Sequence, residues 1–555
     1  QLGAIAAVSV PLTVVQDPAG KNNGTATWTY NVEDNALDFL AQGEKLTLTY
    51  MARVDNNFAA NNEFAFAPFT ITITGTNDTP TIESPAQTAE IEELAGVVDQ
   101  DTLDTATGTI EFEDVDLTDE HEVTITGVAA SGTVTGLPGG ALPNSTVLAW
   151  LSLGAFVDST DGVTGSQVWN FSAEDHYFDY LAEGETLTLT YTVEVVDDYG
   201  ATVTQDVVVT VTGTNDAPEL AIDTSGDDGL HAITELPGVT GDDTDDTASG
   251  SLTFRDVDLS DTHSVSASVP VFNWTNSYSQ TLTVSQINGL TAASTLELTL
   301  HDSTGTGNGS IDFDYSAADY YFDFLAEGET LTITYEVTVL DEHNVASTQP
   351  VTITVTGSND APVAVADVAS GIVEAGHDAN NDPVAGIPST SGNVLDNDTD
   401  VDLTDTHEVV GAAAGTATGV LTGGVGTAIE GVYGTLTLNA DGTWTYVLNN
   451  DDPDTDALPE GAEVVDIFSY TQSDPYGAKS TTTLTINITG TNDEPVVAAA
   501  LTDAADEGAA VFTQNLLEGA SDVDDGAILS VANVTYAVDG GDPLPTPPAG
   551  ISRSG

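Results

Sequence analysis

The octapeptide VTGTNDAP, residues 211–218, joins a run of Val and Thr to a turn that contains Gly, Asn, Asp and Pro. Close variants recur at residues 73–80, 355–362 and 488–495, each preceded by a Val, Ile and Thr run. The Asp of the Asn-Asp pair falls at positions 78, 216, 360 and 493, so the spacings are 138, 144 and 133 residues. Repeats of this length are too long for a solenoid and match a small domain. The sequence therefore predicts a string of similar domains.

A second motif, DVDL, keeps the same phase as the Asn-Asp pair. It occurs at residues 114–117, 256–259 and 400–403, and a weaker form, DVDD, occurs at 522–525. Each copy begins 29 to 40 residues after the Asp of an Asn-Asp pair. The shared phase indicates that both motifs belong to the meeting point of consecutive domains.

We divide the chain into five units at the Asn-Asp pairs. The segment LGAIAAV, from residue 2, aligns with LGAFVDS, from residue 153, so the first unit is expected to lack its N-terminal part. The last unit is expected to lack its C-terminal part, and both ends of the sequence resemble cuts through a longer array. The predicted β-sandwich repeats are unit 1 (1–78, partial), unit 2 (79–216), unit 3 (217–360), unit 4 (361–493) and unit 5 (494–555, partial). The boundaries at 78, 216, 360 and 493 are called junctions 1 to 4.

The charge of the chain limits its partners. It has 6 Lys and Arg against 89 Asp and Glu, which gives a formal net charge of −83. Nucleic acids and anionic membrane surfaces are repelled by such a chain, whereas cations are attracted. A hydrophobic content of 40% is too high for a disordered chain, and the absence of cysteine excludes disulfides and thiolate chemistry. We expect folded domains without membrane insertion.

Alternating apolar residues predict β-strands in every unit. In residues 185–196, Leu187, Leu189, Tyr191, Val193 and Val195 alternate with Thr and Glu, and residues 330–340 repeat the pattern. NADGTW, residues 439–444, predicts a hairpin turn, and no sustained helical period is found. The predicted fold class is all-β, a tandem array of immunoglobulin-like β-sandwiches of about seven strands each that forms an extended rod.

Several of these motifs, in a fixed order, resemble one known family. GSLTFRDVDLSDTHSVSA (250–267), YYFDFLAEGETLTITYEVTVLD (320–341), VTITVTGSNDAP (351–362) and YGTLTLNADGTWTYVLNN (433–450) are similar to the VCBS repeats of giant secreted bacterial adhesins. The resemblance covers essentially the whole chain. It implies tandem β-sandwiches that extend a ligand-binding tip away from a cell, in a secreted, extracellular or bacterial cell-surface protein.

The order of motifs also resembles the cadherin domain, which implies Ca²⁺ at each junction. In cadherins the ion is held by a Glu near the first strand, an Asp and a Glu before a late strand, an Asn-Asp linker, and Asp residues of the next domain. At junction 1 the implied ligands are Asp38, Glu44, Asn77, Asp78, Asp114, Asp116 and Asp197. At junction 2 they are Glu93, Asp179, Glu183, Asn215, Asp216, Asp256, Asp258 and Asp341. At junction 3 they are Glu235, Asp323, Glu327, Asn359, Asp360, Asp400, Asp402 and Asp474. At junction 4 they are Glu374, Asp456, Glu460, Asn492, Asp493, Asp522 and Asp524.

The chemistry of these residues suits calcium. Ca²⁺ takes six to eight oxygen ligands, and carboxylates from two domains repel each other until a cation joins them. Proline after the Asn-Asp pair restricts the linker further. One difference from the cadherin linker is the Gly at positions 75, 213, 357 and 490, where cadherins carry an Asp, so the number of ions per junction stays open.

Other site chemistries find less support in the sequence. His121, His263 and His407 recur once per unit without a second His, which favours a structural residue at a strand start over a zinc site. No HExxH, P-loop or dinucleotide-binding motif occurs, so we do not expect an enzyme. Residues 136–156 and 271–280 are the places where a lectin site or a lateral contact would lie, although extra strands of the sandwich are favoured there.

Two functions therefore remain. The favoured one is a calcium-rigidified stalk or spacer segment of a large secreted adhesin that mediates cell-surface or biofilm attachment. The alternative is a structural subunit of an extracellular fibre, sheath or surface layer. The expected partners are calcium ions at the junctions and neighbouring repeats of the same longer chain, and in the alternative other copies in a fibre.

Overall fold

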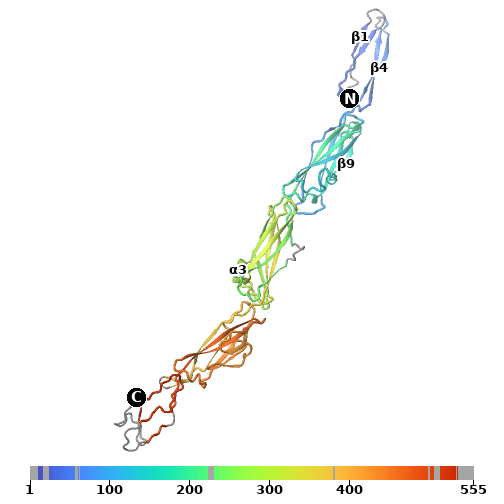
Figure 1. Ribbon diagram of the computed structural model, residues 1–555. Helices are drawn as coiled ribbons and strands as arrows, with labels where there is room; N and C mark the ends of the chain where they lie inside the picture. The colour runs from blue at the N-terminus through green and yellow to red at the C-terminus, as the bar shows by residue number, and fades with distance from the viewer. Residues whose placement is uncertain are drawn as a thin grey trace.

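The computed structural model of the chain is an elongated row of β-sandwiches (Figure 1). It describes residues 11–16, 24–56, 60–61, 63–222, 230–378, 382–497, 500–504, 513–532 and 534–535. Units 1 and 5 lie at opposite ends of the row, as expected for domains joined end to end. The segment LGAIAAV, used above to align unit 1, lies outside the described residues.

Unit 2 is a sandwich of two four-stranded sheets, ordered β5-β7-β10-β9 and β6-β12-β11-β8. All neighbours are antiparallel except β6, which runs parallel to β12. The parallel pair places β6, which follows the short strand β5, beside the last strand of the unit, which ends at the junction. The strands are β5 (Thr81–Ile82), β6 (Gln87–Glu92), β7 (Leu103–Glu113), β8 (His121–Gly132), β9 (Leu151–Val157), β10 (Gly165–Glu174), β11 (Thr186–Asp197) and β12 (Thr202–Thr212).

Unit 3 repeats this topology with sheets β13-β15-β19-β18 and β14-β21-β20-β16, and β17 also pairs with β20. The strand β14 runs parallel to β21, as β6 does to β12. The strands are β13 (Glu219–Ile222), β14 (Leu230–Thr234), β15 (Asp245–Arg255), β16 (Ser264–Ala267), β17 (Val271–Thr275), β18 (Thr295–His301), β19 (Asn308–Ala318), β20 (Thr330–Leu340) and β21 (Ala346–Thr356).

Unit 4 has sheets β22-β31-β30-β26 and β25-β29-β28-β27 and a small ribbon, β23-β24. The parallel pair that includes the last strand recurs as β22 and β31. The strands are β22 (Asp367–Val373), β23 (Gly376–His377), β24 (Pro383–Val384), β25 (Ser389–Asn393), β26 (Glu408–Ala414), β27 (Ala428–Glu430), β28 (Gly434–Leu438), β29 (Thr443–Leu448), β30 (Glu463–Ser473) and β31 (Lys479–Thr489).

The described parts of units 1 and 5 are smaller. Unit 1 has the ribbon of β1 (Leu12–Gln16) and β2 (Gly24–Trp28) and the ribbon of β3 (Lys45–Asp55) and β4 (Phe64–Thr74). In unit 5, Val496 and Ser521 form an isolated bridge. Units 2, 3 and 4 thus contribute eight, nine and ten described strands, more than the seven predicted, because short edge strands were not visible in the sequence pattern.

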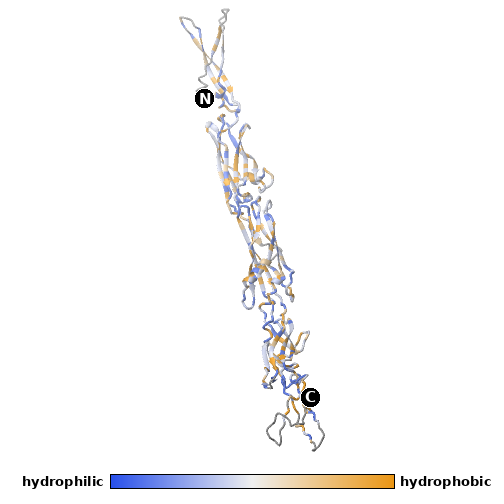
Figure 2. Cartoon of the chain, turned by 90° about the vertical axis from the view of Figure 1, so that its left-hand side faces the viewer, coloured by the Kyte–Doolittle hydropathy of each residue, from blue (hydrophilic) through white to orange (hydrophobic). Residues whose placement is uncertain are grey.

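Each complete unit has its own hydrophobic core. The predicted alternation in β11 is confirmed, since Leu187, Leu189, Tyr191, Val193 and Val195 are all fully buried. The buried residues form three separate clusters, one for each of units 2, 3 and 4. Figure 2 shows apolar residues recurring along the strands inside the units, with hydrophilic segments between them. The units can therefore be held together only by what lies at the junctions.

Two short helices were not predicted. Helix α2 (Ser145–Ala149) begins after Asn144, and α3 (Val284–Ala293) begins with a capping box between Thr283 and Gln286. The expectation that 136–156 and 271–280 add strands is confirmed for β9, which pairs with β10, and for β17, which pairs with β20. The hairpin at 439–444 is confirmed by the pairing of β28 with β29.

Single 3-10 turns precede the late strand of units 1, 2 and 3. They span Asp34–Ala36, Asp175–Tyr177 and Asp319–Tyr321. In unit 2, the turn leads into Leu181, whose carbonyl lies against Gly213 of the repeated motif. A Cβ at Gly213 would lie 2.0 Å from that oxygen. A Cβ at Gly75 or Gly357 would lie 2.2 Å from the carbonyl oxygen of the corresponding Leu40 or Leu325. The motif contains Gly because backbone packs directly on backbone there.

Replacing Gly213 by Ala is expected to destabilise unit 2 by about 2 kcal/mol, because the new methyl group must displace main chain rather than a side chain. Gly127 is the matched control, since it has open space around its Cβ position. Hydrogen exchange measured along β11 and β12 should be faster in Gly213→Ala than in Gly127→Ala. Equal protection in the two variants would contradict the packing argument.

Candidate metal centre

The Asn-Asp pair reaches across junctions 1 to 3 through two hydrogen bonds and across junction 4 through one. The Nδ2 atoms of Asn77, Asn215 and Asn359 donate to the late Asp of the next unit, with distances to Asp197, Asp341 and Asp474 of 2.9, 3.2 and 3.0 Å. The backbone N–H groups of Asp78, Asp216, Asp360 and Asp493 donate to the second Asp of the DVD motif, with distances to Asp116, Asp258, Asp402 and Asp524 of 2.8, 2.8, 2.9 and 3.0 Å. The linker therefore positions carboxylates of the following unit.

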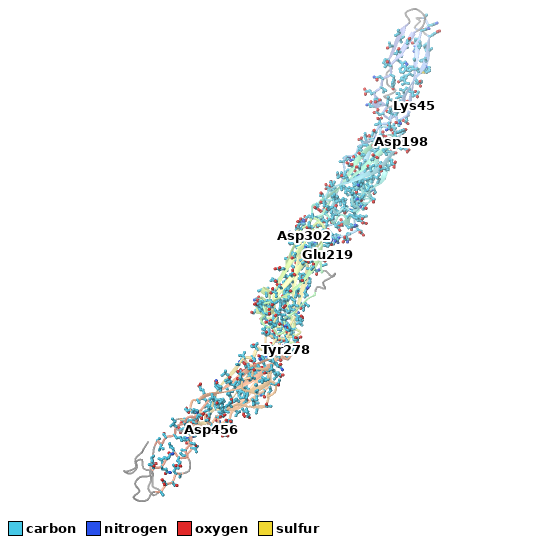
Figure 3. The ribbon with its side chains drawn as sticks, in the orientation of Figure 1. Lys45, Asp198, Glu219, Tyr278, Asp302 and Asp456 are labelled. Atoms are coloured by element: carbon cyan, nitrogen blue, oxygen red, sulfur yellow. The ribbon has the colours of Figure 1, made fainter. Side chains whose placement is uncertain are left out.

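The DVD motif is itself folded by its first Asp. In unit 3, Asp256 Oδ1 accepts from the backbone N–H of Asp258 at 3.0 Å, and the same bond recurs in units 2, 4 and 5 at 2.9 to 3.1 Å. The turn directs both carboxylates of the motif toward the preceding unit. Figure 3 places Lys45 of unit 1 near Asp198 of unit 2 along the rod, on the two sides of junction 1.

The preceding unit contributes a Glu directly after β6, β14 or β22, the strand that runs parallel to its last strand. One carboxylate oxygen of this Glu accepts from the linker backbone: Thr214 donates to Glu93 at 2.8 Å, Ser358 to Glu235 at 2.8 Å, and Thr491 to Glu374 at 3.1 Å. The other oxygen of each Glu is buried and has no hydrogen-bond partner. Each Glu is thus fixed by the linker while one of its oxygens stays available.

Unpartnered buried oxygens recur at the predicted ligand positions. Asp216, at junction 2, is fully buried, and neither of its carboxylate oxygens has a partner. A buried polar atom without a hydrogen bond is costly, and a set of such oxygens at one junction is an arrangement that a bound cation could satisfy. Predicted ligands with at least one such oxygen are Asn77, Glu93, Asp116, Asp179, Asn215, Asp216, Glu235, Asp258, Asp323, Asn359, Asp360, Glu374, Asp400, Asp402, Asp493 and Asp524.

The ligand atoms also converge. One oxygen from each of Glu235, Asp323 and Asp360 lies within 4.8 Å of the other two, and these three side chains are all buried at junction 3. Glu374, Asp456 and Asp493 make the corresponding group at junction 4. Asp256, Asp261 and Asp341 form a group on the unit 3 side of junction 2. The donor set consists of hard oxygens, which fits calcium.

Burial and mutual repulsion raise the pKa values of these acids. Burial, reinforced by Asp216, Asp258 and Asp179, raises the pKa of Glu93 to about 9, although the Thr214 N–H opposes the shift. Burial also raises the pKa of both Asp258 and Asp402 to about 8 and that of Glu235 and Glu374 to about 7. Without a cation, these groups therefore hold protons near neutral pH.

Two of the three recurring histidines, His121 and His263, contact the first Asp of the DVD motif. His121 Nε2 lies 3.2 Å from Asp114 Oδ2 and its Nδ1 lies 2.8 Å from Asp158 Oδ1. In unit 3, His263 makes the same pair of contacts, with Asp256 and Asp302, at 2.8 and 2.7 Å. Burial lowers the pKa of both histidines, but these hydrogen bonds outweigh it and leave each pKa raised. Their role as residues at a strand start is supported, with an orienting contact that the sequence did not reveal.

The predicted ligands occupy three kinds of position. The buried ones are Glu93, Asp114, Asp116, Asp179, Asp197, Asp216, Glu235, Asp256, Asp258, Asp323, Asp341, Asp360, Glu374, Asp402, Asp474 and Asp524. Partly buried are Asp38, Glu44, Asn77, Asp78, Asn215, Asn359, Asp400, Asp456, Asn492, Asp493 and Asp522. Glu183, Glu327 and Glu460 are exposed. Glu183 pairs with His343 of unit 3, with 3.0 Å between Oε2 and Nδ1, and Glu460 accepts from the backbone N–H of Asn492 at 3.3 Å.

In units 2 and 3, the Glu directly before the late strand was not among the predicted ligands. The counterpart of Glu44 there is Glu185 and Glu329, two residues after the exposed Glu183 and Glu327. Glu329 is buried and accepts from Thr404 of unit 4 at 2.7 Å, as Glu44 accepts from Thr118 of unit 2 at 3.1 Å. The Gly-Glu dipeptide before all three late strands was the available signal.

Five further acids at the junctions were missed. Asp119, Asp261 and Asp405 stand three residues after the second Asp of the DVD motif, and Asp175 and Asp319 open the 3-10 turns. Each has a buried oxygen without a hydrogen-bond partner. Their recurrence in phase with the motif, as in DVDLTD and DVDLSD, could have identified the first three.

Comparison with known proteins gives a family match for part of the chain. Residues 359–490 match the family model for the bacterial cadherin-like domain. Those residues nearly coincide with unit 4. No curated protein matches the chain. Within the described residues, no helix has the length and apolar character needed to cross a membrane.

Solved cadherin structures are similar to the chain at low identity. The protocadherin gamma B4 extracellular domain is 14% identical with a TM-score of 0.35, over 89% of this chain and 62% of that one. Drosophila N-cadherin EC1-4 is 11% identical with a TM-score of 0.23, over 80% and 84%. Mouse cadherin-23 EC22-24 is 11% identical with a TM-score of 0.27, over 75% and 100%. The chain thus spans less than two thirds of the protocadherin gamma B4 structure.

The raised pKa values predict an unusual pH dependence in buffer that contains a chelator. The pKa of Glu93 is about 9 in the folded chain against an ordinary value of 4.5, so the folded state binds a proton that the unfolded state releases. The stability of unit 2 is therefore expected to fall as the pH rises through this interval.

Glu93→Gln should flatten this fall, because an amide resembles the protonated acid, whereas Glu122→Gln, at an exposed position, should not. Thermal unfolding of the full chain, followed by calorimetry from about pH 5 to about pH 9, measures the difference. A stability that rises over this interval in the parent chain would contradict the assignment of Glu93 as a buried, proton-binding acid.

Proposed function

We propose that this chain is a calcium-rigidified stalk segment of a large secreted bacterial adhesin, which holds a binding tip away from the cell surface. The observation that carries the proposal is the pairing, at successive junctions, of a linker that fixes carboxylates with buried oxygens that lack partners. The match of residues 359–490 to a bacterial cadherin-like domain supports it. The proposed location is extracellular or at the bacterial cell surface.

The units in this proposal are 79–216, 217–360 and 361–493, with parts of two others at 11–78 and 494–535. Each proposed boundary lies in the coil between a last strand and the next unit, as at Thr212 and Glu219 around junction 2. The proposed ligands are the buried and partly buried acids and amides named above, with Asp119, Asp261 and Asp405 added. Bound calcium would supply positive charge and multidentate coordination to oxygens from both units.

The protein itself holds these carboxylate oxygens close together, although the negative charges repel one another. The Asn-Asp linker orders Asp216 and Asp258 beside each other, and the Glu93 carboxylate is fixed on the linker backbone. Because the cores of neighbouring units are separate, the alignment of the rod depends on whether this repulsion is neutralised. Sites of this extracellular kind bind calcium at roughly 10⁻⁴ to 10⁻³ M, so an extracellular medium would fill them.

Polar contacts outside the carboxylate clusters also cross junction 3. The backbone N–H of Leu403 donates to Phe324 O at 3.2 Å, and Tyr476 OH donates to Glu327 O at 3.4 Å, both across junction 3. These contacts define how the units meet, but each is a single hydrogen bond of modest net value. They allow the units to bend when the carboxylates repel, which makes stiffness dependent on the ion.

Removing calcium is expected to lower the melting temperature and to increase the flexibility of the rod. A ligand that binds only the folded, aligned form stabilises it by mass action. Millimolar Ca²⁺ should restore both properties after chelation, whereas NaCl at matched ionic strength should not, since screening does not replace coordination. Calorimetry and small-angle scattering measure the two effects. Full rescue by NaCl alone would show that the Asn-Asp repeats are ordinary turns on an acidic rod.

Replacing Asn215 and Asp216 together by Ala should uncouple units 2 and 3 without unfolding either. The double variant removes the donor to Asp341 and the backbone-positioned carboxylate, while the two cores stay intact. The control, Asn170→Ala with Asp206→Ala, removes the same residue types from the strands β10 and β12. In millimolar calcium, scattering should show bending for the first variant only, and a parent-like rod would exclude the linker as a ligand site.

Imaging of native particles separates the two functions considered above. Single thin strands tethered to a cell are the result expected of a stalk. Ordered filaments that contain many chains would instead support the fibre subunit.

A further inference from the structure

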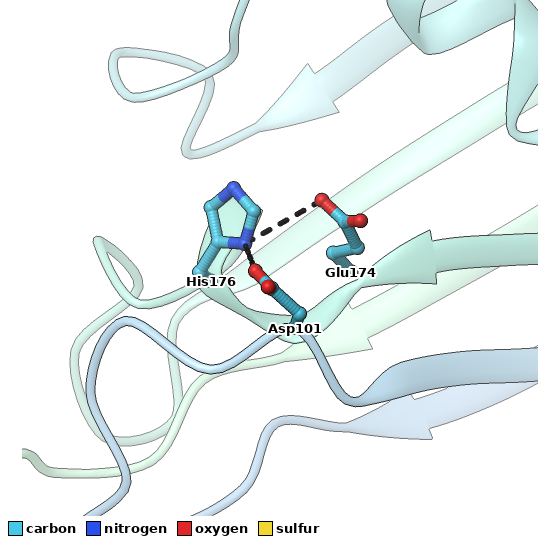
Figure 4. A group of neighbouring side chains, drawn as sticks. All are labelled: Asp101, Glu174 and His176. Atoms are coloured by element: carbon cyan, nitrogen blue, oxygen red, sulfur yellow. Dashed lines mark ion pairs between the residues drawn. The ribbon is translucent and has the colours of Figure 1, made fainter.

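A histidine and two carboxylates converge on the surface of unit 2, apart from the proposed calcium ligands. The Nδ1 atom of His176 lies 3.5 Å from Asp101 Oδ1 and 3.7 Å from Glu174 Oε2 (Figure 4). The three ligand atoms all lie within 4.8 Å of one another. Figure 4 shows both carboxylates directed toward the same ring nitrogen.

The backbone holds the three residues in place. The N–H of His176 donates to Gln100 O at 3.1 Å, and the N–H of Asp175 donates to Thr102 O at 2.8 Å, so the loop with Asp101 is tied to the 3-10 turn with His176. Glu174 is the last residue of β10. The imidazole also packs against Tyr177, with ring centroids 4.1 Å apart. The arrangement therefore belongs to the fold of unit 2.

The contacts of His176 differ from those of His121 and His263. The Nδ1 atom of His176 is buried but makes no hydrogen bond, and its distances to the carboxylates are long. In contrast, both ring nitrogens of His263 lie within 2.8 Å of a carboxylate oxygen. A nitrogen held between two carboxylates without a hydrogen bond to either leaves room for an ion among the three.

We propose that Asp101, Glu174 and His176 form a binding site for a divalent transition-metal ion, with Zn²⁺ as the ion that fits best. Tetrahedral Zn²⁺ with bonds of about 2.0 to 2.2 Å places neighbouring ligand atoms roughly 3.3 to 3.6 Å apart, close to the spacing around His176. Imidazole nitrogen selects zinc and related metals over calcium, which takes oxygen ligands. Water completes the coordination, so the site is open and of moderate affinity.

The site lies beside the contact that joins units 2 and 3. Asp99, two residues before Asp101, accepts two hydrogen bonds from Arg255 of unit 3, at 2.7 and 3.2 Å, and its backbone N–H donates to Asp179 Oδ2 at 2.8 Å. Metal binding that fixes Asp101 also fixes the loop that carries Asp99. The site thus adds a metal-dependent constraint at junction 2 that does not rely on the calcium ligands.

Unit 3 provides the natural comparison. There the N–H of Tyr320 donates to Asp242 O and that of Asp319 to Thr244 O, so Asp243, Ala318 and Tyr320 stand where unit 2 has Asp101, Glu174 and His176. Unit 3 keeps the backbone arrangement and one carboxylate but lacks two of the three ligands. Substitutions that exchange these residue types are therefore compatible with the fold in both directions.

The test is calorimetric titration of the full chain with Zn²⁺ in saturating Ca²⁺. His176→Tyr and Glu174→Ala should each weaken the affinity of one Zn²⁺ site at least about tenfold, whereas His301→Gln, which removes an exposed histidine paired with Asp312, should leave that site intact. The variant Ala318→Glu with Tyr320→His should gain one site. Circular dichroism confirms that each variant is folded.

Two results would overturn the proposal. One is that His176→Tyr and Glu174→Ala bind zinc as tightly as the parent. The other is that the parent binds no zinc at 1 mM of metal, which is about the upper end for extracellular metal sites. Because calcium is saturating in every arm, either result leaves the calcium sites at the junctions untested and the two proposals separate.

Discussion

Repulsion among buried carboxylates at the junctions is the constraint on which the rest of the structure depends. The Asn-Asp linker donates one hydrogen bond to each of two carboxylates of the next unit, and a Glu of the preceding unit accepts from the linker. These bonds fix the positions of the acids but leave other buried oxygens, such as both of Asp216, without partners. The protein thus gathers acidic groups at a fixed geometry, and in the proposed function a cation would neutralise them.

Because the three hydrophobic cores are separate, the alignment of the units depends on the junctions. Each complete unit buries its own cluster of apolar and aromatic residues, and little apolar contact crosses a junction beyond Leu259 of unit 3, which packs against the core of unit 2. In the proposed function, loss of the cation would therefore change how the units are aligned more than whether they are folded. A rod of this kind can be stiff or flexible with the same domains.

Most of the fold could be read from the sequence, because alternating apolar residues mark half-buried strands. The buried positions of β11 and β20, such as Leu187 and Leu331, follow the predicted period. Short edge strands and helix α3 could not be read in this way, although TVSQ at 283–286 carries the residues of its capping box. Periodicity does not report elements of two or three residues.

The candidate site was predictable as far as motifs repeat in phase. The Asn-Asp pairs and the DVD motifs do so, and the structure places them against one another. The Gly-Glu dipeptide marks Glu185 as the counterpart of Glu44, whereas the contact of Glu183 with His343 of unit 3 could not be read from spacing, because it depends on how the two units meet. The Gly that replaces the cadherin Asp at position 213 is explained by close backbone packing on Leu181.

A crystal structure of the full chain grown in millimolar CaCl₂ tests the central claim most directly. The account predicts anomalous density for calcium at the junctions, within reach of the unpartnered oxygens of Glu93, Asp216 and Asp258 at junction 2 and of Glu235, Asp360 and Asp402 at junction 3. Ordered water alone at these positions, with the same alignment of the units, would contradict it.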